Sequence, residues 1–359
     1  MIPISICVIS KNEEKHMENF LSSIQKHFNG YPYEIVIVDT GSTDKTVEIA
    51  RKYTNNVSYF EWTNDFSAAR NYSIQKASHN WILVLDCDEY VTELDFVSLQ
   101  AMIEEHPKCI GNILCRSHCT MSVSKQKNIQ TDSLARFFNR NFFHFESIIH
   151  EQVMPIRPSL DRRYVNIGLT VEHYGYSGTP EEMDQKADRN ISLLLEALKK
   201  QPDNAYLCFQ LGTTYRTIEQ LDKACEYFEL GLSLQPDPRS PYVLDMIIKY
   251  GYCLMELDQP QKTLEFIELY DIYSYSAEYV YFVANIYYEN RMYLQALTEF
   301  LKLTTYENPK TYGLNTFMAY YNMGYINELL GEKEAAVALY NKCGDYPPAL
   351  TRLKSLKKG

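Results

Sequence analysis

The sequence lacks any apolar run of the roughly 18 residues that a membrane-spanning helix needs. It also lacks a basic amphipathic segment that would anchor it to lipid. Its first residues, Met1–Ile9, have no basic start of the kind found in secretory signals, and they read as a first core strand. We therefore expect no transmembrane helix and a cytoplasmic protein.

The sequence also has few positive charges: it contains 35 Lys and Arg against 46 Asp and Glu, which gives a net charge of -11. Such a chain has no basic field to hold a nucleic-acid backbone, so we expect no general nucleic-acid binding. The nine Cys are an odd number scattered through apolar contexts, which favours reduced thiols over a disulfide framework. Their one cluster, Cys115–Cys119, lacks the second Cys pair of most zinc sites and leaves structural zinc as a minor alternative.

What is present is typical of a folded protein: 359 residues, 45% of them hydrophobic, suffice for about two domains. The first half alternates strand and helix signals. Strands are predicted at Ile4–Ile9, Glu34–Asp39, Tyr59–Trp62 and Trp81–Leu85, with helices at Glu14–Phe28, Thr46–Tyr53 and Phe66–Ala77. Such alternation predicts a Rossmann-like α/β domain with a mostly parallel sheet between helices. From Arg136 to Tyr176 we expect short strands and active-site loops.

The second half is helical and repetitive. Gly212 and Tyr215, followed by Ala224 and Phe228, fit the roughly 34-residue tetratricopeptide pattern. The pattern returns around Gly251, Ala284 and Gly324. Most of the 30 Tyr residues lie here, where they are expected to fill gaps between helix pairs. We predict three segments: an α/β domain at 1–178, a linker helix at 179–200 and an all-α repeat domain at 201–359.

The stretch Trp81–Glu89 carries the strongest chemical signal, because an apolar strand ends in Asp86-Cys87-Asp88-Glu89. Residues i and i+2 of a strand point the same way, so Asp86 and Asp88 are expected to converge on one cation. Hard oxygen ligands suit Mg²⁺ or Mn²⁺, which share substrate phosphates. The carboxyl end of a strand is also where open α/β sheets bind ligands.

Four ordered motifs resemble family 2 glycosyltransferases of the GT-A fold: Cys7–Glu14, Ile37–Asp44, Asp65–Asn71 and Asp86–Glu89. Together with the repeats, the chain further resembles bacterial enzymes that glycosylate bacteriocin peptides on Cys, Ser or Thr. The stretch Thr40–Asp44 is also an ordinary glycine turn with a helix cap, and Asp44 is assigned to that cap.

The resemblance implies roles for the site residues. The nucleotide of a UDP-sugar would be held by residues of all four motifs, namely Asn12, Glu13, Asp39, Arg70, Asn71 and Asp86. Asp86 would face the ribose or a metal-bound water, and Asp88 with His173 would hold the Mg²⁺ or Mn²⁺. Arg70 is expected to pair with the Asp86 region or reach the diphosphate.

An inverting enzyme of this family also needs a base for the acceptor. Glu151, which follows an aromatic stretch, is the predicted base, and Asp132 is its rival. The family often has Glu-Asp here, whereas this chain has His150-Glu151.

The leading hypothesis is thus an inverting, metal-dependent transferase that moves a hexose, of Glc or GlcNAc type, from a UDP-sugar to a Cys, Ser or Thr side chain of a peptide or protein. The repeats would position the acceptor or pair two subunits as a homodimer. One alternative is a transferase acting on a cell-envelope polysaccharide or lipid-linked saccharide. Another is a non-catalytic repeat scaffold with a degenerate nucleotide-binding domain.

Overall fold

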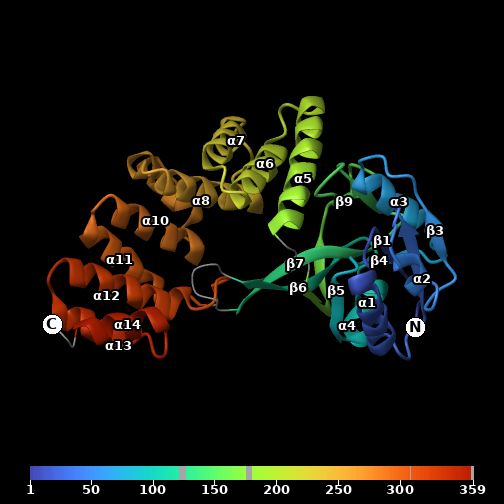
Figure 1. Cartoon of the computed structure of the whole chain (residues 1–359), viewed down its shortest axis with the longest axis horizontal. Helices are drawn as coiled ribbons and strands as arrows, with labels where there is room; N and C mark the ends of the chain where they lie inside the picture. The colour runs from blue at the N-terminus through green and yellow to red at the C-terminus, as the bar shows by residue number, and fades with distance from the viewer. Residues whose placement is uncertain (121–126, 175–179, 308, 357–359) are drawn as a thin grey trace. The chain divides into compact units, whose positions relative to one another are not determined.

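The computed structural model describes residues 1–120, 127–174, 180–307 and 309–356, and its contacts divide the chain into two compact units, Met1–Lys186 and Ala187–Gly359. The division falls within the helix α5 (Pro180–Lys200), the segment predicted as a linker helix. The exact boundaries at residues 178 and 200 stay predictions. Figure 1 shows the α/β unit and the helical unit along the chain.

The first unit is built on an eight-stranded sheet in the order β3-β2-β1-β4-β7-β6-β10-β5. Its strands in chain order are β1 (Ile4–Ser10), β2 (Tyr33–Asp39), β3 (Val57–Tyr59), β4 (Trp81–Val84), β5 (Glu89–Leu94), β6 (Ile110–Thr120), β7 (Lys127–Asn139) and β10 (Tyr164–His173). A separate hairpin joins β8 (Phe143–Glu146) to β9 (Gln152–Pro155). The helices are α1 (Glu14–His27), α2 (Thr46–Ala50), α3 (Phe66–Lys76) and α4 (Phe96–Glu105).

The strands β1 to β4 form the parallel half of the sheet. β1 pairs in parallel with β2 and β4, and β2 with β3, so their carboxyl ends meet at one edge. The predictions for β1, β2 and β4 are confirmed. The third was wrong in its bounds, because β3 covers Val57–Tyr59 instead of Tyr59–Trp62. Only the backbone N–H of Phe60, which donates to Asp39 O at 2.9 Å, continues the pairing.

Helices cover both faces of this sheet, as the alternating pattern predicted. On one face Phe20 of α1 and Leu99 of α4 pack on the alternate β1 residues, such as Ile6. On the other face Ile74 of α3 and Phe145 of β8 pack on Cys7 and its neighbours. Burial on both faces explains why these strands read as continuous apolar runs.

The other half of the sheet is mostly antiparallel, a pairing that was not predicted from the sequence. The short strands expected from Arg136 to Tyr176 are present as β8, β9 and β10. β4 pairs antiparallel with β7, which forms a long hairpin with β6. β10 then runs parallel to β6 and antiparallel to β5. Because β7 is aligned on β4 with Phe137 opposite Leu83, the preceding residue Arg136 lies beside the carboxyl end of β4.

The second unit is a series of helices that pack in consecutive pairs. They are α6 (Ala205–Thr217), α7 (Leu221–Ser233), α8 (Pro241–Glu256), the 3₁₀ segment η1 (Pro260–Leu269), α9 (Tyr270–Tyr273), α10 (Ala277–Glu289), α11 (Tyr293–Leu303), the π segment η2 (Leu314–Met318), α12 (Ala319–Leu329), α13 (Lys333–Asn341) and α14 (Pro347–Leu356). Small residues allow the close approach: a Cβ on Gly212 would lie 2.5 Å from the Phe228 ring. Across the described residues, no helix is both long and apolar enough to cross a membrane.

Candidate active site

The site begins where β4 ends and the chain turns through Asp86-Cys87-Asp88 into β5. The turn is closed from both sides, since Glu89 N donates to Asp86 O at 3.0 Å and Asp86 N donates to Glu89 Oε2 at 3.0 Å. The Cys87 side chain points inward, with Sγ 3.8 Å from Ile9 O. Because the strand stops at Val84, its two-residue period does not extend to Asp86 and Asp88. The two carboxylates have different ionic partners, unlike the converging pair expected from the sequence.

Asp86 is paired with two arginines from different elements. Its Oδ1 lies 2.8 Å from Arg70 Nη2 on α3, and its Oδ2 lies 2.8 Å from Arg136 Nη2 on β7. Burial alone would raise the pKa of Asp86, but the two guanidinium groups hold it well below its usual range. The predicted pairing of Arg70 with the Asp86 region is thus present. The Asp86 side chain keeps 33% of its surface exposed, enough to meet a ligand.

Arg70 also connects Asp86 to Glu151. Its Nε donates to Glu151 Oε1, and its guanidinium carbon lies 5.6 Å from the centre of the Phe145 ring. Burial lowers the pKa of Arg70, but the carboxylates of Asp86 and Glu151 more than offset that effect and raise it. The helix α3 fixes this arginine because Asp65 caps its first turn, accepting from Ala68 N at 2.9 Å.

Arg136 is a residue of the site that sequence reasoning missed, and Glu89, although part of the carboxylate motif, had no predicted role. Arg136 Nη2 lies 2.9 Å from Glu89 Oε1 as well as 2.8 Å from Asp86, and the Glu89 side chain is only 4% exposed. Burial raises the pKa of Glu89, although the nearby Arg136 acts to lower it. Burial acts to lower the pKa of Arg136, but the carboxylates of Glu89 and Asp86 outweigh that effect and raise it. A signal existed, since Arg136 interrupts the otherwise apolar run Leu134–Phe138, where a charge needs a partner.

Asp88 faces His173, the last residue of β10. His173 Nε2 lies 3.4 Å from Asp88 Oδ2, and both side chains are 22% exposed. Ser117 Oγ on β6 lies 3.2 Å from His173 Nδ1, and Tyr174 N donates to Asp88 O at 3.0 Å. Burial lowers the pKa of His173, but Asp88 reverses that effect and raises it.

A carboxylate beside an imidazole held through its other nitrogen is a donor set that fits a divalent cation. No group of three or more protein ligands occurs among the residues that the structure describes. Two protein ligands suit Mg²⁺ or Mn²⁺, which normally take further oxygens from water and substrate phosphates.

The residues expected to face a nucleotide lie at the ends of β1 and β2. Asn12 has a φ of 55°, and its Oδ1 accepts from Thr43 N at 2.8 Å, which ties the two loops together. Asp39 is buried; its Oδ2 accepts from Gly41 N and Ser42 N, each at 3.0 Å, while its Oδ1 has no partner among the described atoms. Burial and the nearby Asp88 raise the pKa of Glu13 to about 7.

Asn71 and Asp44 hold local structure. Asn71 Nδ2 donates to Phe145 O at 2.8 Å and Asn71 Oδ1 accepts from Phe145 N at 3.0 Å, so its amide binds β8 as a neighbouring strand would. Its predicted nucleotide contact stays a prediction. Asp44 accepts from Thr46 N at 3.0 Å and from Glu14 N at 3.1 Å, so it bonds the first residue of α2 and of α1, although the N-cap position of α2 is Lys45.

The predicted base, Glu151, follows a loop with unusual backbone geometry. Ser147 and His150 have φ values of 80° and 50°, and Ile148 O accepts from Phe66 N at 2.9 Å, which holds the loop against α3. The Glu151 side chain is 11% exposed. Its rival Asp132 lies on β7 opposite Cys115 and is exposed. The zinc alternative falls partly outside the description, since the side chains of His118 and Cys119 are not among those described.

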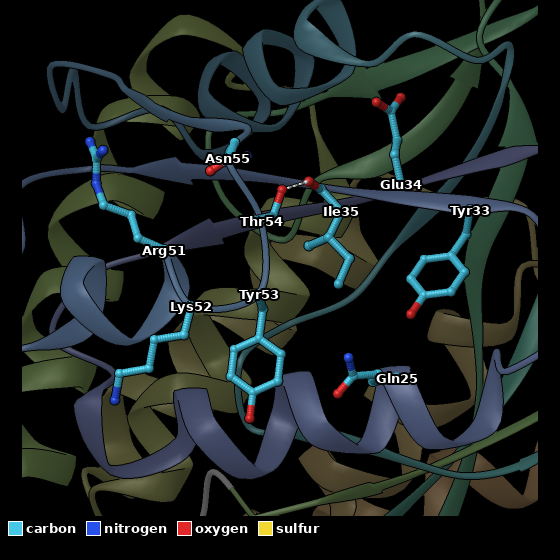
Figure 2. Close-up of a pocket in the computed structure, with 9 residues that line it drawn as sticks. All are labelled: Gln25, Tyr33, Glu34, Ile35, Arg51, Lys52, Tyr53, Thr54 and Asn55. Carbon is cyan, nitrogen blue, oxygen red and sulfur yellow. Dashed lines mark hydrogen bonds between the residues drawn. The ribbon is translucent and has the colours of Figure 1, made fainter.

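A surface pocket of about 440 Å³ lies away from these residues. It borders the start of β2 and the link from α2 to β3, and Figure 2 shows Tyr33 and Tyr53 on either side of Ile35. Thr54 Oγ1 donates to Ile35 O at 2.8 Å. This pocket flanks the opposite end of β2 from Asp39, so none of the predicted site residues line it.

The family match of the sequence covers most of the unit that contains the carboxylate turn. Residues 5–164 match "Glycosyl transferase family 2", and residues 205–238 and 319–349 match the tetratricopeptide repeat. The N-terminal unit is a family 2 glycosyltransferase domain. Tetratricopeptide repeats follow it, which confirms the predicted order of an α/β GT-A domain and a helical repeat region.

Several curated proteins resemble the chain, over stretches that range from 30% to 68% of its length. A TPR repeat-containing protein of Synechococcus elongatus is 29% identical over 68% of this chain and 60% of its own length. The SPbeta prophage-derived glycosyltransferase SunS of Bacillus subtilis is 26% identical over 64% of this chain and 53% of its own. The poly(ribitol-phosphate) beta-N-acetylglucosaminyltransferase TarS of Staphylococcus aureus is 34% identical over 30% of this chain and 20% of its own. The chain thus spans less than two thirds of the length of these relatives.

Proposed function

We propose that the protein is an inverting, metal-dependent glycosyltransferase that moves a hexose from a UDP-sugar to a Cys, Ser or Thr side chain of a peptide or protein. The observation that carries the proposal is the pairing of Asp88 with His173 beside an arginine-bound Asp86, at the carboxyl edge of a family 2 domain. An oxygen and nitrogen donor pair next to fixed cationic groups suits a diphosphate bound with a divalent ion.

For the donor, Asn12, Glu13 and Asp39 would hold the nucleotide at the ends of β1 and β2. The buried, unpartnered Oδ1 of Asp39 supports this role, because a buried acceptor gains most from a donor on a ligand. Asp86 would accept from the ribose through its exposed side. Asp88 and His173 would hold the Mg²⁺ or Mn²⁺, which when bound neutralises the charge on the departing diphosphate.

For the acceptor, Glu151 would remove the proton from the attacking hydroxyl or thiol. Arg70 orients its carboxylate through Nε, and its own contact with Asp86 ties that orientation to the donor turn. Asp132 remains the rival base. A thiol acceptor would need less assistance than a hydroxyl, since a thiol loses its proton nearer neutral pH.

The peptide or protein acceptor is supported by the resemblance of the motifs and repeats to bacterial enzymes that glycosylate bacteriocin peptides. The match to the glycosyltransferase SunS covers 64% of the chain and so reaches beyond the family 2 domain. The repeats would position that acceptor or pair two copies as a homodimer. A second candidate, transfer to a cell-envelope polymer, is favoured by the similarity to TarS, although that match covers only 30% of the chain. A non-catalytic scaffold is the third reading, and the ordered ionic site argues against it.

The deciding experiment is a panel of UDP-sugars incubated with the full chain and Mn²⁺, Mg²⁺ or a chelator, with release of UDP measured. We expect metal-dependent hydrolysis of at least one UDP-hexose. Absence of hydrolysis, together with absence of UDP binding, would support the scaffold. Transfer to a Cys- or Ser-containing peptide, compared with transfer to a teichoic-acid polymer, separates the two enzymatic readings.

A further inference from the structure

Five buried or half-buried charges form one continuous chain of ion pairs across the site. In order they are Glu151, Arg70, Asp86, Arg136 and Glu89. Charges alternate along the chain, so each guanidinium lies between two carboxylates. The two ends have different surroundings. Glu151 follows a loop in which Ser147 and His150 have positive φ values. Glu89 accepts from Asp86 N and so closes the turn that contains Asp88.

Arg136 is the partner of Glu89, the most deeply buried carboxylate of this chain of ion pairs. A single atom, Nη2, bonds both Asp86 Oδ2 at 2.8 Å and Glu89 Oε1 at 2.9 Å. Without it, Glu89 would keep a buried carboxylate with no cationic partner among the residues that the structure describes. Removing one partner of a buried pair is costly because the remaining charge stays desolvated.

The contacts of Glu89 lead directly to the turn. Its Oε2 accepts from Asp86 N at 3.0 Å, and its own backbone N donates to Asp86 O at 3.0 Å. Asp88 lies within this closed turn and faces His173. If the Glu89 carboxylate moved, its bond to Asp86 N would be lost, and the position of the Asp88 carboxylate relative to His173 would no longer be fixed.

We propose that Arg136 is a positioning residue that acts through Glu89 and Asp86 to hold Asp88 in place, and thereby sets the affinity of the site for a divalent ion with UDP. The inference depends on the proposed function, because it assumes that Asp88 and His173 bind the ion. The ion pairs of Arg136 are with Asp86 and Glu89 and not with Asp88 or His173, so its effect is indirect.

The test is calorimetric titration of Mn²⁺ into the full chain saturated with UDP, for wild type and variants. Arg136→Gln should weaken Mn²⁺ binding by about tenfold or more, the usual effect of removing a partner that orients a metal ligand. Arg136→Lys should restore most of the affinity, because one nitrogen makes both contacts and a lysine carries one charged nitrogen.

Arg140→Gln is the matched control. Arg140 directly follows β7, and its Nη1 donates to Ile74 O at 3.1 Å and Ala77 O at 2.6 Å, far along the strand from the turn. Its loss should lower the melting temperature without changing Mn²⁺ affinity. Glu89→Gln provides a second route if Arg136→Gln does not fold, and it too should weaken Mn²⁺ binding.

Unchanged Mn²⁺ affinity in folded Arg136→Gln, or in Glu89→Gln where the first variant is unfolded, would overturn the inference. So would equal weakening in Arg136→Gln and Arg140→Gln, which would indicate a general loss of stability. If wild type binds no Mn²⁺ with UDP, the proposed function itself fails; if wild type binds and the variants match it, only the role of Arg136 fails.

Discussion

Removal of the Asp88 carboxylate should abolish activity without unfolding the chain. Its side chain is 22% exposed, and its nearest ionic partner is His173. We expect Asp88→Ala to reduce metal-dependent UDP-sugar turnover by about a hundredfold or more, since stabilisation by a metal is worth several kcal/mol. Hydrolysis rates with Mn²⁺ and the melting temperature measure the two effects separately.

A surface carboxylate gives the comparison for Asp88→Ala. Asp161 pairs with Arg163 at 3.7 Å, and its side chain is 80% exposed, so Asp161→Ala should leave turnover and melting unchanged. Near-normal turnover in Asp88→Ala would remove this residue from the metal site. A melting temperature far below that of the Asp161 variant would instead identify Asp88 as structural.

Glu151 tests the acceptor half of the reaction. Glu151→Gln keeps a side chain of the same size that can still meet Arg70, but it cannot take a proton. Transfer to the acceptor should fall by about a hundredfold or more, as expected for loss of a general base, while UDP-sugar binding is retained. Rates of transfer and the dissociation constant of the donor are the readouts, with Asp132→Asn in parallel. Normal transfer by the Glu151 variant, with loss of transfer by the Asp132 variant, would identify Asp132 as the base.

The environment of His150 predicts that the protein loses stability as the pH falls. Burial lowers its pKa, and its Nε2 has no partner among the described atoms. A histidine favoured in its neutral form stabilises the fold fully above its ordinary pKa, and that contribution is lost as the pH falls through the lowered value. Wild type should therefore lose more stability than His150→Asn between pH values of about 7.5 and 5.5.

Asn is the chosen replacement because it tolerates the φ of 50° at this position. Melting temperatures of the two proteins across the pH series test the prediction. His106→Asn, at an exposed histidine, is the control and should follow wild type. Parallel pH curves for wild type and His150→Asn would mean that protonation of His150 does not affect folding.

At the scale of elements, sequence patterns predicted β1, β2 and β4 because burial on both faces produces uninterrupted apolar runs. The antiparallel pairing of the other half was not predicted, because its strands are not continuous apolar runs. β6 and β7 extend into polar stretches, such as Lys127–Ser133, whose pairing is decided by register between strands and not by composition. The third strand was displaced because the aromatic residues Phe60 and Trp62 suggested a strand, whereas the ladder ends at Tyr59.

The site was predicted in the same uneven way. Asp86, Asp88, Arg70 and Glu151 stand in motifs that can be recognised one at a time. The pairing between such residues cannot be recognised in this way: Glu89 pairs with Arg136 across 47 residues, and Arg70 pairs with Glu151 across 81. Such contacts depend on the strand order β4-β7-β6-β10, which local periodicity does not encode.

In the repeats, the helices pack so closely that adding a single carbon is expected to lower the free energy of unfolding. A Cβ on Gly212 of α6 would lie 2.5 Å from Phe228 of α7, so Gly212→Ala forces the ring to move. Overpacking of this kind costs about 1–3 kcal/mol, of which the better helix propensity of Ala returns up to about 1. Denaturant unfolding should show net destabilisation, whereas Thr217→Ala, at the exposed end of the same helix, should change little. A neutral Gly212→Ala would mean that the helix pair can separate without cost.

At the scale of the whole molecule, the two units have separate cores. The sheet residues pack with α1 to α4, whereas the repeat helices form clusters among themselves, such as that of Ala284, Phe300 and Ile326. Each unit thus contains the apolar contacts that a domain needs to fold alone. The residues proposed to bind the donor, from Asn12 to His173, all belong to the first unit.

A chain ending at Lys200 should therefore fold and keep hydrolysing the UDP-sugar, but transfer to a peptide or protein acceptor should fall more steeply because the repeats are expected to position it. The ratio of transfer to hydrolysis, measured for the full and shortened chains at equal donor concentration, isolates the acceptor effect from any loss of folded enzyme. Circular dichroism of the shortened chain reports whether the α/β unit has folded. Equal loss of both reactions would show that the repeats support folding of the first unit. An unchanged ratio in a well-folded chain would place acceptor recognition within the family 2 domain.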